Sequence, residues 1–249
     1  MTKLQGKAAL VTGASKGIGA GIAKSLAAEG AAVVVNYASS KEDADRVVDQ
    51  IIKRNGRAIA LQGDVSKASD LERIFTEATK AFGQLDILVN NAGVYQFAPL
   101  EDITEDHFHR QFNTNVLGLI LATREAAKHF GPQGGSVINI GSAASSIFAP
   151  GTCVYTATKG AVDAVTGVLA KELGPRKIRI NSINPGFVGT EGTQAAGFVG
   201  SDFVNGLIAQ TPLGRGGRPD DIGPIAVFLA SDDSRWLTGE TLLASGGLR

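Results

Sequence analysis

The sequence has little cysteine and no excess of charge of either sign. Its 249 residues include one cysteine, Cys153, so no internal disulfide can form and a reducing compartment is expected. Lysine and arginine together number 24, as do aspartate and glutamate, so the formal net charge is zero. This balance argues against a surface for nucleic acid or for an anionic membrane.

Long hydrophobic runs and an N-terminal targeting pattern are also missing. No apolar stretch reaches the ~18–20 residues that a membrane-spanning helix needs. The opening MTKLQGKAALVTG lacks the basic start, long apolar run and cleavage site of a secretory signal. We therefore expect a cytoplasmic protein without a membrane partner.

Short runs of apolar and β-branched residues recur along the chain, with amphipathic segments between them. The runs are AALVTG near Val11, AAVVVNY near Val34, AIALQGD near Leu61, LDILVNNAG near Leu88, SVINIGS near Ile138, IRINSINPG near Ile180 and ETLLASGG near Leu242. Runs that are apolar throughout are typical of parallel strands covered on both faces. The alternation of such runs with helical segments predicts one doubly wound α/β domain over residues 1–249, with seven strands and about six helices.

One segment, residues 187–217, departs from this rhythm. It is rich in glycine, threonine and alanine, with isolated phenylalanines. Long connections in compact α/β domains are usually functional. We expect short helices that form a mobile lid on the substrate side, and an ordinary surface insertion is the alternative.

The stretch TGASKGIG follows the first predicted strand and opens the first predicted helix. Gly13 permits a sharp turn, Gly17 allows backbone to approach a ligand, and Gly19 allows the helix to pack near the strand. The free N–H groups and the positive dipole end of the helix suit a pyrophosphate. In this strand–turn–helix context the glycines predict a dinucleotide site, and a tight turn without a ligand is the alternative.

Tyr155 and Lys159 stand four residues apart in YTATKGAVDAVTG. On a helix this spacing places two side chains on one face, roughly 6 Å apart. A nearby ammonium favours the phenolate and lowers the tyrosine pKa from its usual value near ~10. We therefore expect Tyr155 to exchange a proton with a substrate. A buried core aromatic is the alternative reading.

With these motifs the chain resembles the short-chain dehydrogenase/reductase family over essentially its whole length. In overall texture it is similar to carbonyl reductases of the 3-oxoacyl-carrier-protein reductase kind. The glycine spacing is Gly-x-x-x-Gly-x-Gly, NNAG at 90–93 follows the fourth strand, and INPGFVGT at 183–190 matches the family's nicotinamide-binding turn. The residues that match the family's catalytic set are Asn115, Ser142, Tyr155 and Lys159. The resemblance implies a single Rossmann-type domain, a seven-stranded parallel sheet with helices on both faces, and a nicotinamide cofactor.

The resemblance also implies a role for each catalytic residue. Tyr155 gives a proton to a carbonyl oxygen or takes one from an alcohol, and Ser142 hydrogen-bonds that oxygen. Lys159 also holds the ribose hydroxyls, and Asn115 anchors a water that passes protons to Lys159. The plainer readings are a turn residue for Ser142 and a helix cap or kink for Asn115.

Three further polar side chains receive no chemical role. His107 and His109 lie in EDHFHRQF, which we interpret as a charged helical surface. A metal site is not expected there, because the sequence nearby offers no third ligand. Cys153 precedes Tyr155 by two residues, which places it near the expected cleft. No base that could activate its thiol is visible in the sequence.

The residues expected to bind the cofactor lie in six stretches of the chain. They are Gly13, Ser15, Lys16, Gly17, Ile18, Gly19, Asn36, Tyr37, Ser39, Asp64, Val65, Asn91, Ala92, Gly93, Tyr155, Lys159, Pro185, Gly186, Val188 and Thr190. Tyr37 stands where NAD-preferring relatives carry an acidic residue, so no carboxylate repels a 2′-phosphate. Lys16 and Ser39 can bind that phosphate, so the sequence predicts NADP(H) as the cofactor. NAD(H) is the weaker alternative, because Ala38 stands where many NADP enzymes carry an arginine that binds the phosphate. Asp64 is expected to accept from the adenine amino group.

The expected substrate side of the cleft is mainly apolar, formed by Tyr95, Phe97, Ala144, Phe148, Phe187 and Phe198. This composition predicts reduction of a hydrophobic ketone or aldehyde. Three alternatives stay open: oxidation of a sugar in the manner of glucose 1-dehydrogenase, reduction of a 3-oxoacyl thioester on a carrier protein, and a dinucleotide-binding protein without turnover. The helices predicted at 111–130 and 153–174 carry apolar residues beyond what the sheet needs, and the resemblance implies a homotetramer with 222 symmetry.

Overall fold

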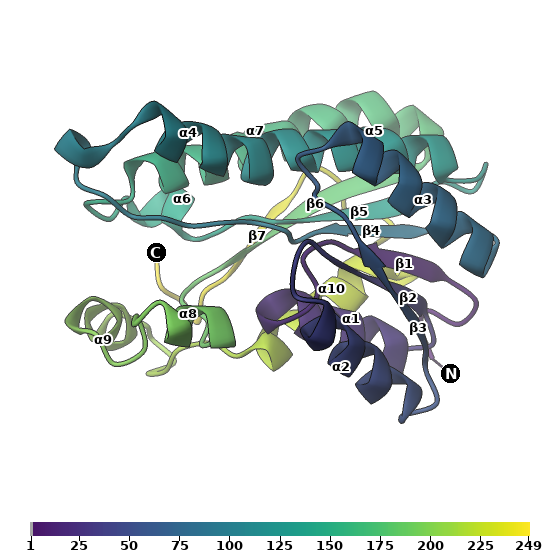
Figure 1. The fold of residues 1–249 in the computed structure, drawn as a ribbon, viewed down its shortest axis with the longest axis horizontal. Coiled ribbons are helices and arrows are strands. Elements are labelled where there is room, and N and C mark those ends of the chain that lie inside the picture. Colours follow the sequence, from purple (N-terminus) through teal and green to yellow (C-terminus); the bar gives the residue numbers. More distant parts are fainter. Residues whose placement is uncertain (1) are drawn as a thin grey trace.

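The computed structural model of the chain describes residues 2–249, which form a seven-stranded sheet (Figure 1). The strands are β1 (Ala8–Val11), β2 (Ala32–Tyr37), β3 (Arg57–Gln62), β4 (Ile87–Asn90), β5 (Gly135–Ile140), β6 (Ile178–Pro185) and β7 (Thr241–Ala244). All neighbours pair in parallel, in the order β3-β2-β1-β4-β5-β6-β7. The seven predicted strands and the doubly wound fold are therefore confirmed.

Helices cover both faces of this sheet. Those of 12 residues or more are α1 (Gly17–Ala28), α2 (Lys41–Ile52), α3 (Ala68–Phe82), α5 (Gly118–His129), α7 (Cys153–Leu173) and α10 (Pro219–Ala230). Figure 1 shows α3, α5 and α7 on one face and α1, α2 and α10 on the other. Shorter helices are α4 (Glu105–Phe112), α6 (Ala144–Ile147), α8 (Glu191–Ala195) and α9 (Asp202–Ala209), with 3₁₀ turns at Leu100–Asp102, Gly174–Arg176 and Asp232–Ser234 and a π-helical turn at Asn113–Leu117.

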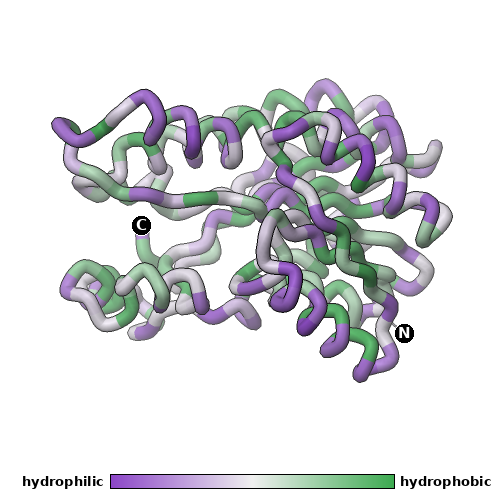
Figure 2. The backbone as a smooth tube through the Cα atoms, in the orientation of Figure 1, coloured by the Kyte–Doolittle hydropathy of each residue, from purple (hydrophilic) through white to green (hydrophobic). Residues whose placement is uncertain are grey.

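The hydrophobic core is split by the sheet into two layers. Ala9 and Val11 of β1 pack into the layer beneath α1, α2 and α10, whereas Leu10 packs into the opposite layer with α3 and α5. All three side chains are fully buried. Successive residues of a strand point to opposite faces, so β1, which is buried on both faces, is apolar at every position. Figure 2 shows green stretches of backbone inside the molecule and purple turns on the helices around them.

The sheet reverses its winding between β1 and β4, and this reversal positions the site. The crevice at such a switch point, at the carboxyl ends of the strands, is where open α/β sheets bind ligands. Thr12, directly after β1, accepts hydrogen bonds through Oγ1 from the backbone N–H groups of Asn91 and Ala92, each at 3.0 Å. This contact joins the glycine turn to the NNAG segment.

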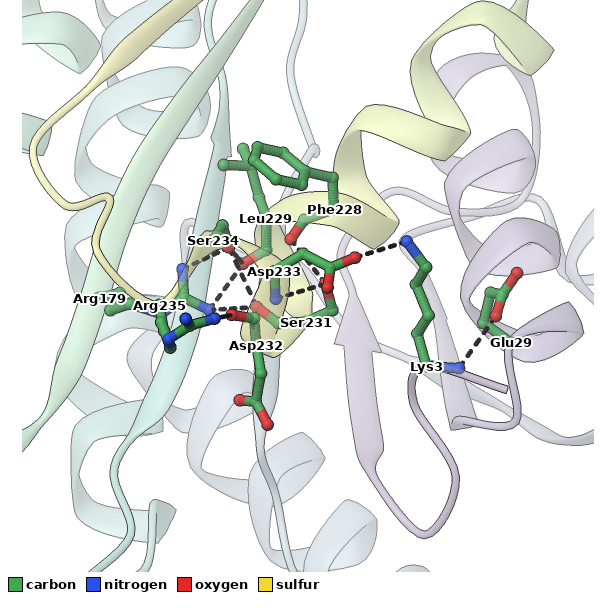
Figure 3. Close-up of polar contacts among 10 residues, drawn as sticks. All are labelled: Lys3, Glu29, Arg179, Phe228, Leu229, Ser231, Asp232, Asp233, Ser234 and Arg235. Atoms are coloured by element: carbon green, nitrogen blue, oxygen red, sulfur yellow. Dashed lines mark hydrogen bonds and ion pairs between the residues drawn. The ribbon is translucent and has the colours of Figure 1, made fainter. Parts of the chain in front are cut away.

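An arginine on β6 holds the C-terminal end of α10 (Figure 3). Arg179 donates to the carbonyl oxygens of Leu229 and Ser231 at 2.8 and 3.2 Å, and to Ser234 Oγ at 2.9 Å. The last carbonyls of a helix have no partner within the helix, so a buried helix end needs such donors. Burial lowers the pKa of the Arg179 guanidinium, and Asp232 opposes this shift. The contact fixes α10, which packs against the helix of the glycine turn.

The segment 187–217 contains α8 and α9 and returns to its starting point. Gly189 N–H donates to Gly217 O at 2.9 Å, and Gly217 N–H donates to Phe187 O at 2.8 Å. We call this pair of hydrogen bonds the clasp. Between its two sides lie α8 and α9, which Figure 1 shows across from α4 and α6.

Candidate active site

A cavity of about 650 Å³ runs along the carboxyl ends of the strands, from the glycine turn to α9. All the residues expected to bind the cofactor line it, together with Ser142. Asn115 does not line it and lies behind it. The sequence reasoning missed Ser40, Ile147, Val204, Leu207 and Leu248, which also line the cavity. Ser40 follows Ser39 directly and could have been found from VNYASSK, whereas nothing local marks the other four.

The glycine turn has the geometry that a dinucleotide needs. Gly13 and Gly17 have φ of +60° and +59°, in the left-handed region that favours glycine. A Cβ on Gly13 would lie 2.8 Å from Ala92 Cα, and one on Gly19 would lie 2.4 Å from Asn91 Nδ2. Side chains at these positions would close the space beneath the start of α1.

The start of α1 already holds an anionic group. The Gly17 N–H, the first of the helix, donates to Glu191 Oε2 of α8 at 3.0 Å. A carboxylate at this point shows that the helix start accepts negative charge, as expected from its free N–H groups and its dipole. The residues present therefore fit the diphosphate of a dinucleotide.

The far end of the cavity fits an adenosine ribose. Tyr37 ends β2 and is buried, while Ser39 beside it and Lys16 at the start of α1 are exposed. Lys16 has no ion-pair partner within residues 2–249. Asp64 Oδ1 accepts from the backbone N–H and the hydroxyl of Ser66 at 3.0 and 2.8 Å. An ammonium group without an ion-pair partner among the described residues therefore lines this end of the cavity.

Asn36 lines the cavity but directs its side chain into the protein. Its Oδ1 accepts from Gly13 N–H at 3.2 Å, and its Nδ2 donates to the carbonyl oxygens of Leu61 and Gly63 at 3.2 and 3.1 Å. These contacts fix the glycine turn against β3. The Asn36 amide therefore holds the glycine turn in place, and direct contacts with a bound cofactor are left to neighbouring residues.

Tyr155 and Lys159 lie one turn apart on α7 and face the same cavity. The Lys159 Nζ atom is 5.7 Å from the centroid of the Tyr155 ring and donates to Ile140 O at 2.9 Å. Burial lowers the pKa of Lys159 to about 8, and the charge of Asp163 opposes this shift. Lys159 is thus held in a desolvated pocket at the end of β5, and Tyr155 lies half-buried beside it.

The expected lowering of the Tyr155 pKa is wrong for the chain without its cofactor. Burial raises the pKa of the Tyr155 hydroxyl, a hydrogen bond from the Ser142 hydroxyl opposes this shift, and Tyr95 adds to it. Desolvation disfavours the phenolate more than the nearby groups favour it. The phenol is therefore protonated at neutral pH.

Asn115 lies in the π-helical turn between α4 and α5. Its Oδ1 accepts from Val94 N–H at 2.8 Å, and its Nδ2 donates to Val94 O at 2.8 Å and to Thr158 Oγ1 at 3.1 Å. A Cβ built on Gly93 would lie 3.4 Å from Asn115 Oδ1 and 3.9 Å from Lys159 Nζ, so both side chains converge there. Single π-turns are frequent at functional sites. The water-anchoring role stays a prediction.

An aromatic cluster forms the wall opposite α7. We define it as Tyr95, Phe97, Phe198 and Phe203. Ring centroids lie 5.6 Å apart for Phe97 and Tyr155, 5.3 Å for Phe97 and Phe198, and 5.9 Å for Tyr95 and Phe198. The rings come from the loop after β4 and from the segment that carries α8 and α9. The end of the cavity nearest the Tyr155 hydroxyl is therefore apolar.

Three sequence interpretations near the site are wrong. Phe148 is 70% exposed and Cys153 is exposed, and neither lines the cavity. His107 is buried, and its Nε2 lies 2.9 Å from Gln96 O and 2.6 Å from Gln111 Nε2. This part of α4 therefore supports the loop that carries the aromatic cluster.

Residues 2–249 contain no group of three or more histidine, cysteine, aspartate or glutamate side chains that could hold a metal ion. None of the helices in this part of the chain has the length and hydropathy needed to cross a membrane.

The fold and the cavity are those of a dinucleotide-binding oxidoreductase, and a tyrosine, a serine and a lysine lie together in this cavity. The sequence pattern of the family described as enoyl-(acyl carrier protein) reductase matches residues 13–249. An uncharacterized oxidoreductase of Methylorubrum extorquens is 59% identical over 249 residues, with all of both chains covered. The chain belongs to the short-chain dehydrogenase/reductase family.

Two further relatives carry more specific descriptions. A hydroxynaphthalene reductase-like protein of Metarhizium majus is 40% identical over 255 residues, with 98% of this chain and 95% of that protein covered. A short-chain dehydrogenase of Burkholderia cenocepacia was solved in complex with NADP. It is 36% identical, with a TM-score of 0.93 and 99% of each chain covered. The NADP complex supports a nicotinamide dinucleotide cofactor.

Proposed function

We propose that the protein reduces the carbonyl group of a hydrophobic ketone or aldehyde to an alcohol, with NADP(H) as the cofactor. One observation carries the proposal. The Tyr155 side chain, half-buried and hydrogen-bonded to Ser142, lies beside the aromatic cluster in the cavity that the glycine turn also lines. A substrate that enters from the aromatic side meets a proton donor and the reacting end of the cofactor together.

When bound, the cofactor supplies a hydride to the carbonyl carbon. The protein supplies the proton and the placement. Ser142 hydrogen-bonds the carbonyl oxygen, and Tyr155 donates its phenolic proton to that oxygen as negative charge develops. The raised pKa of Tyr155 keeps this proton in place until the substrate arrives. The Lys159 ammonium stabilises the phenolate that remains.

The preference for NADP(H) rests on the ribose end of the cavity. Lys16 carries the positive charge there, Ser39 and Ser40 offer hydroxyl donors, and residues 37–40 include no carboxylate. The NADP complex of the Burkholderia relative supports the same choice. NAD(H) is expected to bind more weakly than NADP(H), because it lacks the phosphate that Lys16 would contact.

The choice of substrate rests on the aromatic cluster and on the apolar side chains of Ile147, Val204 and Leu207 that extend it. Such a wall favours flat or aliphatic groups over a sugar, whose hydroxyls need polar partners. The hydroxynaphthalene reductase-like relative supports an aryl substrate. The segment 187–217 acts as the lid that brings Phe198 and Phe203 onto the substrate.

The proposal includes a homotetramer. Three large apolar side chains on or next to α5 and α7 are exposed to solvent. They are Leu117 (42% exposed), Ile120 (36%) and Val168 (55%). Apolar side chains at this level on adjoining helices favour an isologous contact with a second copy. Light scattering at micromolar concentration measures the mass, and a monomeric mass would remove this part of the proposal. A cytoplasmic location stays a prediction.

The test is a substrate panel followed by the absorbance of the reduced nicotinamide. NADPH is supplied with aryl ketones, medium-chain ketones and a 3-oxoacyl thioester, and NADP⁺ with glucose. We expect the highest kcat/KM for an aryl or medium-chain ketone. A higher kcat/KM for glucose would replace the carbonyl reductase by a sugar dehydrogenase. No turnover with any substrate would leave a dinucleotide-binding protein.

A further inference from the structure

A polar cluster lies between β6 and α7, directly beneath the catalytic residues. Asn184 is buried and stands next to the Pro185–Gly186 turn, and Asp163 follows Lys159 by one turn of α7. Asn184 Nδ2 donates to Asp163 Oδ1 at 2.9 Å, and Ser182 Oγ donates to Asn184 Oδ1 at 2.7 Å. The cluster therefore joins the catalytic helix to the strand that ends in the nicotinamide-side turn.

The cluster also reaches the loop that carries Ser142. Asn184 Nδ2 lies 3.4 Å from Ser145 Oγ, which donates to the backbone carbonyl of Ser142 at 3.0 Å. A Cβ on Gly141 would lie 2.0 Å from Asn184 Oδ1, so only glycine fits between Ile140 and Ser142 while Asn184 keeps its place. Three elements that supply the reacting groups thus meet at one asparagine.

Asp163 follows Lys159 by one turn on α7, a spacing that places two side chains on one helix face roughly 6 Å apart, and its charge raises the pKa of Lys159 against the effect of burial. From the other elements packed around Lys159, the neighbours are the uncharged Asn115 and Gly93 and the backbone carbonyl of Ile140. On α7 itself they are the Tyr155 phenol and the carboxylate of Asp163. A carboxylate near a buried ammonium favours its charged form. Because Asn184 holds one oxygen of Asp163, the position of this charge is fixed.

We propose that Asp163 is a positioning residue for the carbonyl reduction: held by Asn184, it keeps Lys159 in its charged form and fixes the end of β6 against the catalytic helix. This inference rests on the proposed function for its kinetic consequence. Its electrostatic part concerns the folded chain alone, and the two parts are tested separately.

The first test is a double-mutant cycle on thermal stability at pH 7, which needs no turnover. Asp163→Asn keeps an oxygen that can accept from Asn184 and removes the charge. We expect it to lower Tm by roughly 2–4 °C when Lys159 is present and by less than about 1 °C beside Lys159→Met. Equal losses in both backgrounds would show a purely structural contact and overturn the proposal.

The second test is the pH profile of kcat/KM for reduction of the best ketone of the panel. In Asp163→Asn the Lys159 ammonium loses its proton at lower pH, so the alkaline limb moves to lower pH. We expect the ratio of variant to wild-type activity to fall roughly threefold between pH 7 and pH 9. Glu172→Gln, which removes the same charge from an exposed position of α7, is the control and leaves the profile in place.

The outcomes separate the two proposals. A wild-type protein without turnover removes the proposed function, and the stability cycle still decides whether Asp163 acts on Lys159. An active wild-type protein with an unchanged profile in Asp163→Asn overturns the role of Asp163 alone. If Asp163→Asn does not fold, Asp163→Glu takes its place. It retains the charge, so the wild-type profile is expected, and a shifted profile contradicts the inference.

Discussion

Replacing Lys159 by methionine separates the charge of this side chain from its bulk. Lys159 is 7% exposed, and burial lowers its pKa from 10.5 to about 8. Each pKa unit corresponds to about 1.36 kcal/mol, so the charged side chain destabilises the folded protein by about 3 kcal/mol at pH 7. Methionine has no charge and a similar length, but it leaves Ile140 O without the lysine donor, which costs about 1 kcal/mol.

We therefore expect Lys159→Met to be more stable than the wild-type protein by about 2 kcal/mol at pH 7, or by about 4–8 °C in Tm. Loss of a hydrogen-bonded side chain usually lowers the stability of a protein, whereas here we expect it to raise the stability. Catalytic activity is expected to be lost, because the phenolate of Tyr155 then has no ammonium beside it. This side chain would thus be retained for chemistry at the expense of stability.

The pH dependence of this stability difference shows whether the buried charge of Lys159 causes it. Between pH 8 and pH 10.5 the unfolded chain binds a proton at Lys159 that the folded chain has lost, so wild-type stability rises with pH across this window. The advantage of Lys159→Met is therefore full below pH 8 and absent above pH 10.5.

Thermal melts of both proteins without dinucleotide, from pH 7 to pH 10.5, measure this difference. Lys171→Met, at an exposed position of the same helix, is the control and is expected to show no such trend. A Tm difference that is negative at pH 7, or that is constant across the range, would refute the reasoning.

Three further predictions concern the cofactor and the proton donor. Tyr155→Phe removes the transferable proton, and we expect the rate to fall by at least ~10²–10⁴-fold with little change in NADPH binding; a variant that keeps a tenth of wild-type turnover would exclude the assignment. Lys16→Ala is expected to reduce kcat/KM for NADPH by about 1–3 kcal/mol in free energy and to spare NADH; equal losses would show that Lys16 does not contact the 2′-phosphate. Glu191→Gln removes the negative charge that accepts from Gly17 N–H and competes with the cofactor for the helix start. The Kd of NADPH, measured by its fluorescence, is therefore expected to fall roughly 3–10-fold. An unchanged Kd would show that displacing the carboxylate from the helix start costs no binding free energy.

The elements that the sequence predicted well are those whose signal is local. Each of the seven strands is a short apolar run, and the burial of β1 on both faces accounts for the absence of alternation in AALV. The glycine turn is equally local, because Gly13 and Gly17 need φ values that other residues rarely adopt. The spacing of Tyr155 and Lys159 alone predicts that they share a helix face, and both line the same cavity.

The errors concern burial, which depends on segments far apart in the sequence. EDHFHRQF has the charge pattern of an exposed helix, yet His107 is buried because Gln96, eleven residues earlier, packs against it. Phe148 has a positive φ of 54° and points away from the cavity. The pKa of Tyr155 was predicted from its neighbour on the helix, whereas the desolvation that raises it arises from the whole fold.

The clasp at the base of residues 187–217 makes this segment structurally independent of the sheet. The segment leaves and rejoins the body between Phe187 and Gly217, so its length and composition can change while the sheet beneath it stays intact. Doubling the length of such a loop costs only about 0.6 kcal/mol in closure entropy. The side chains above Tyr155 can therefore change while the glycine turn and the sheet keep their structure.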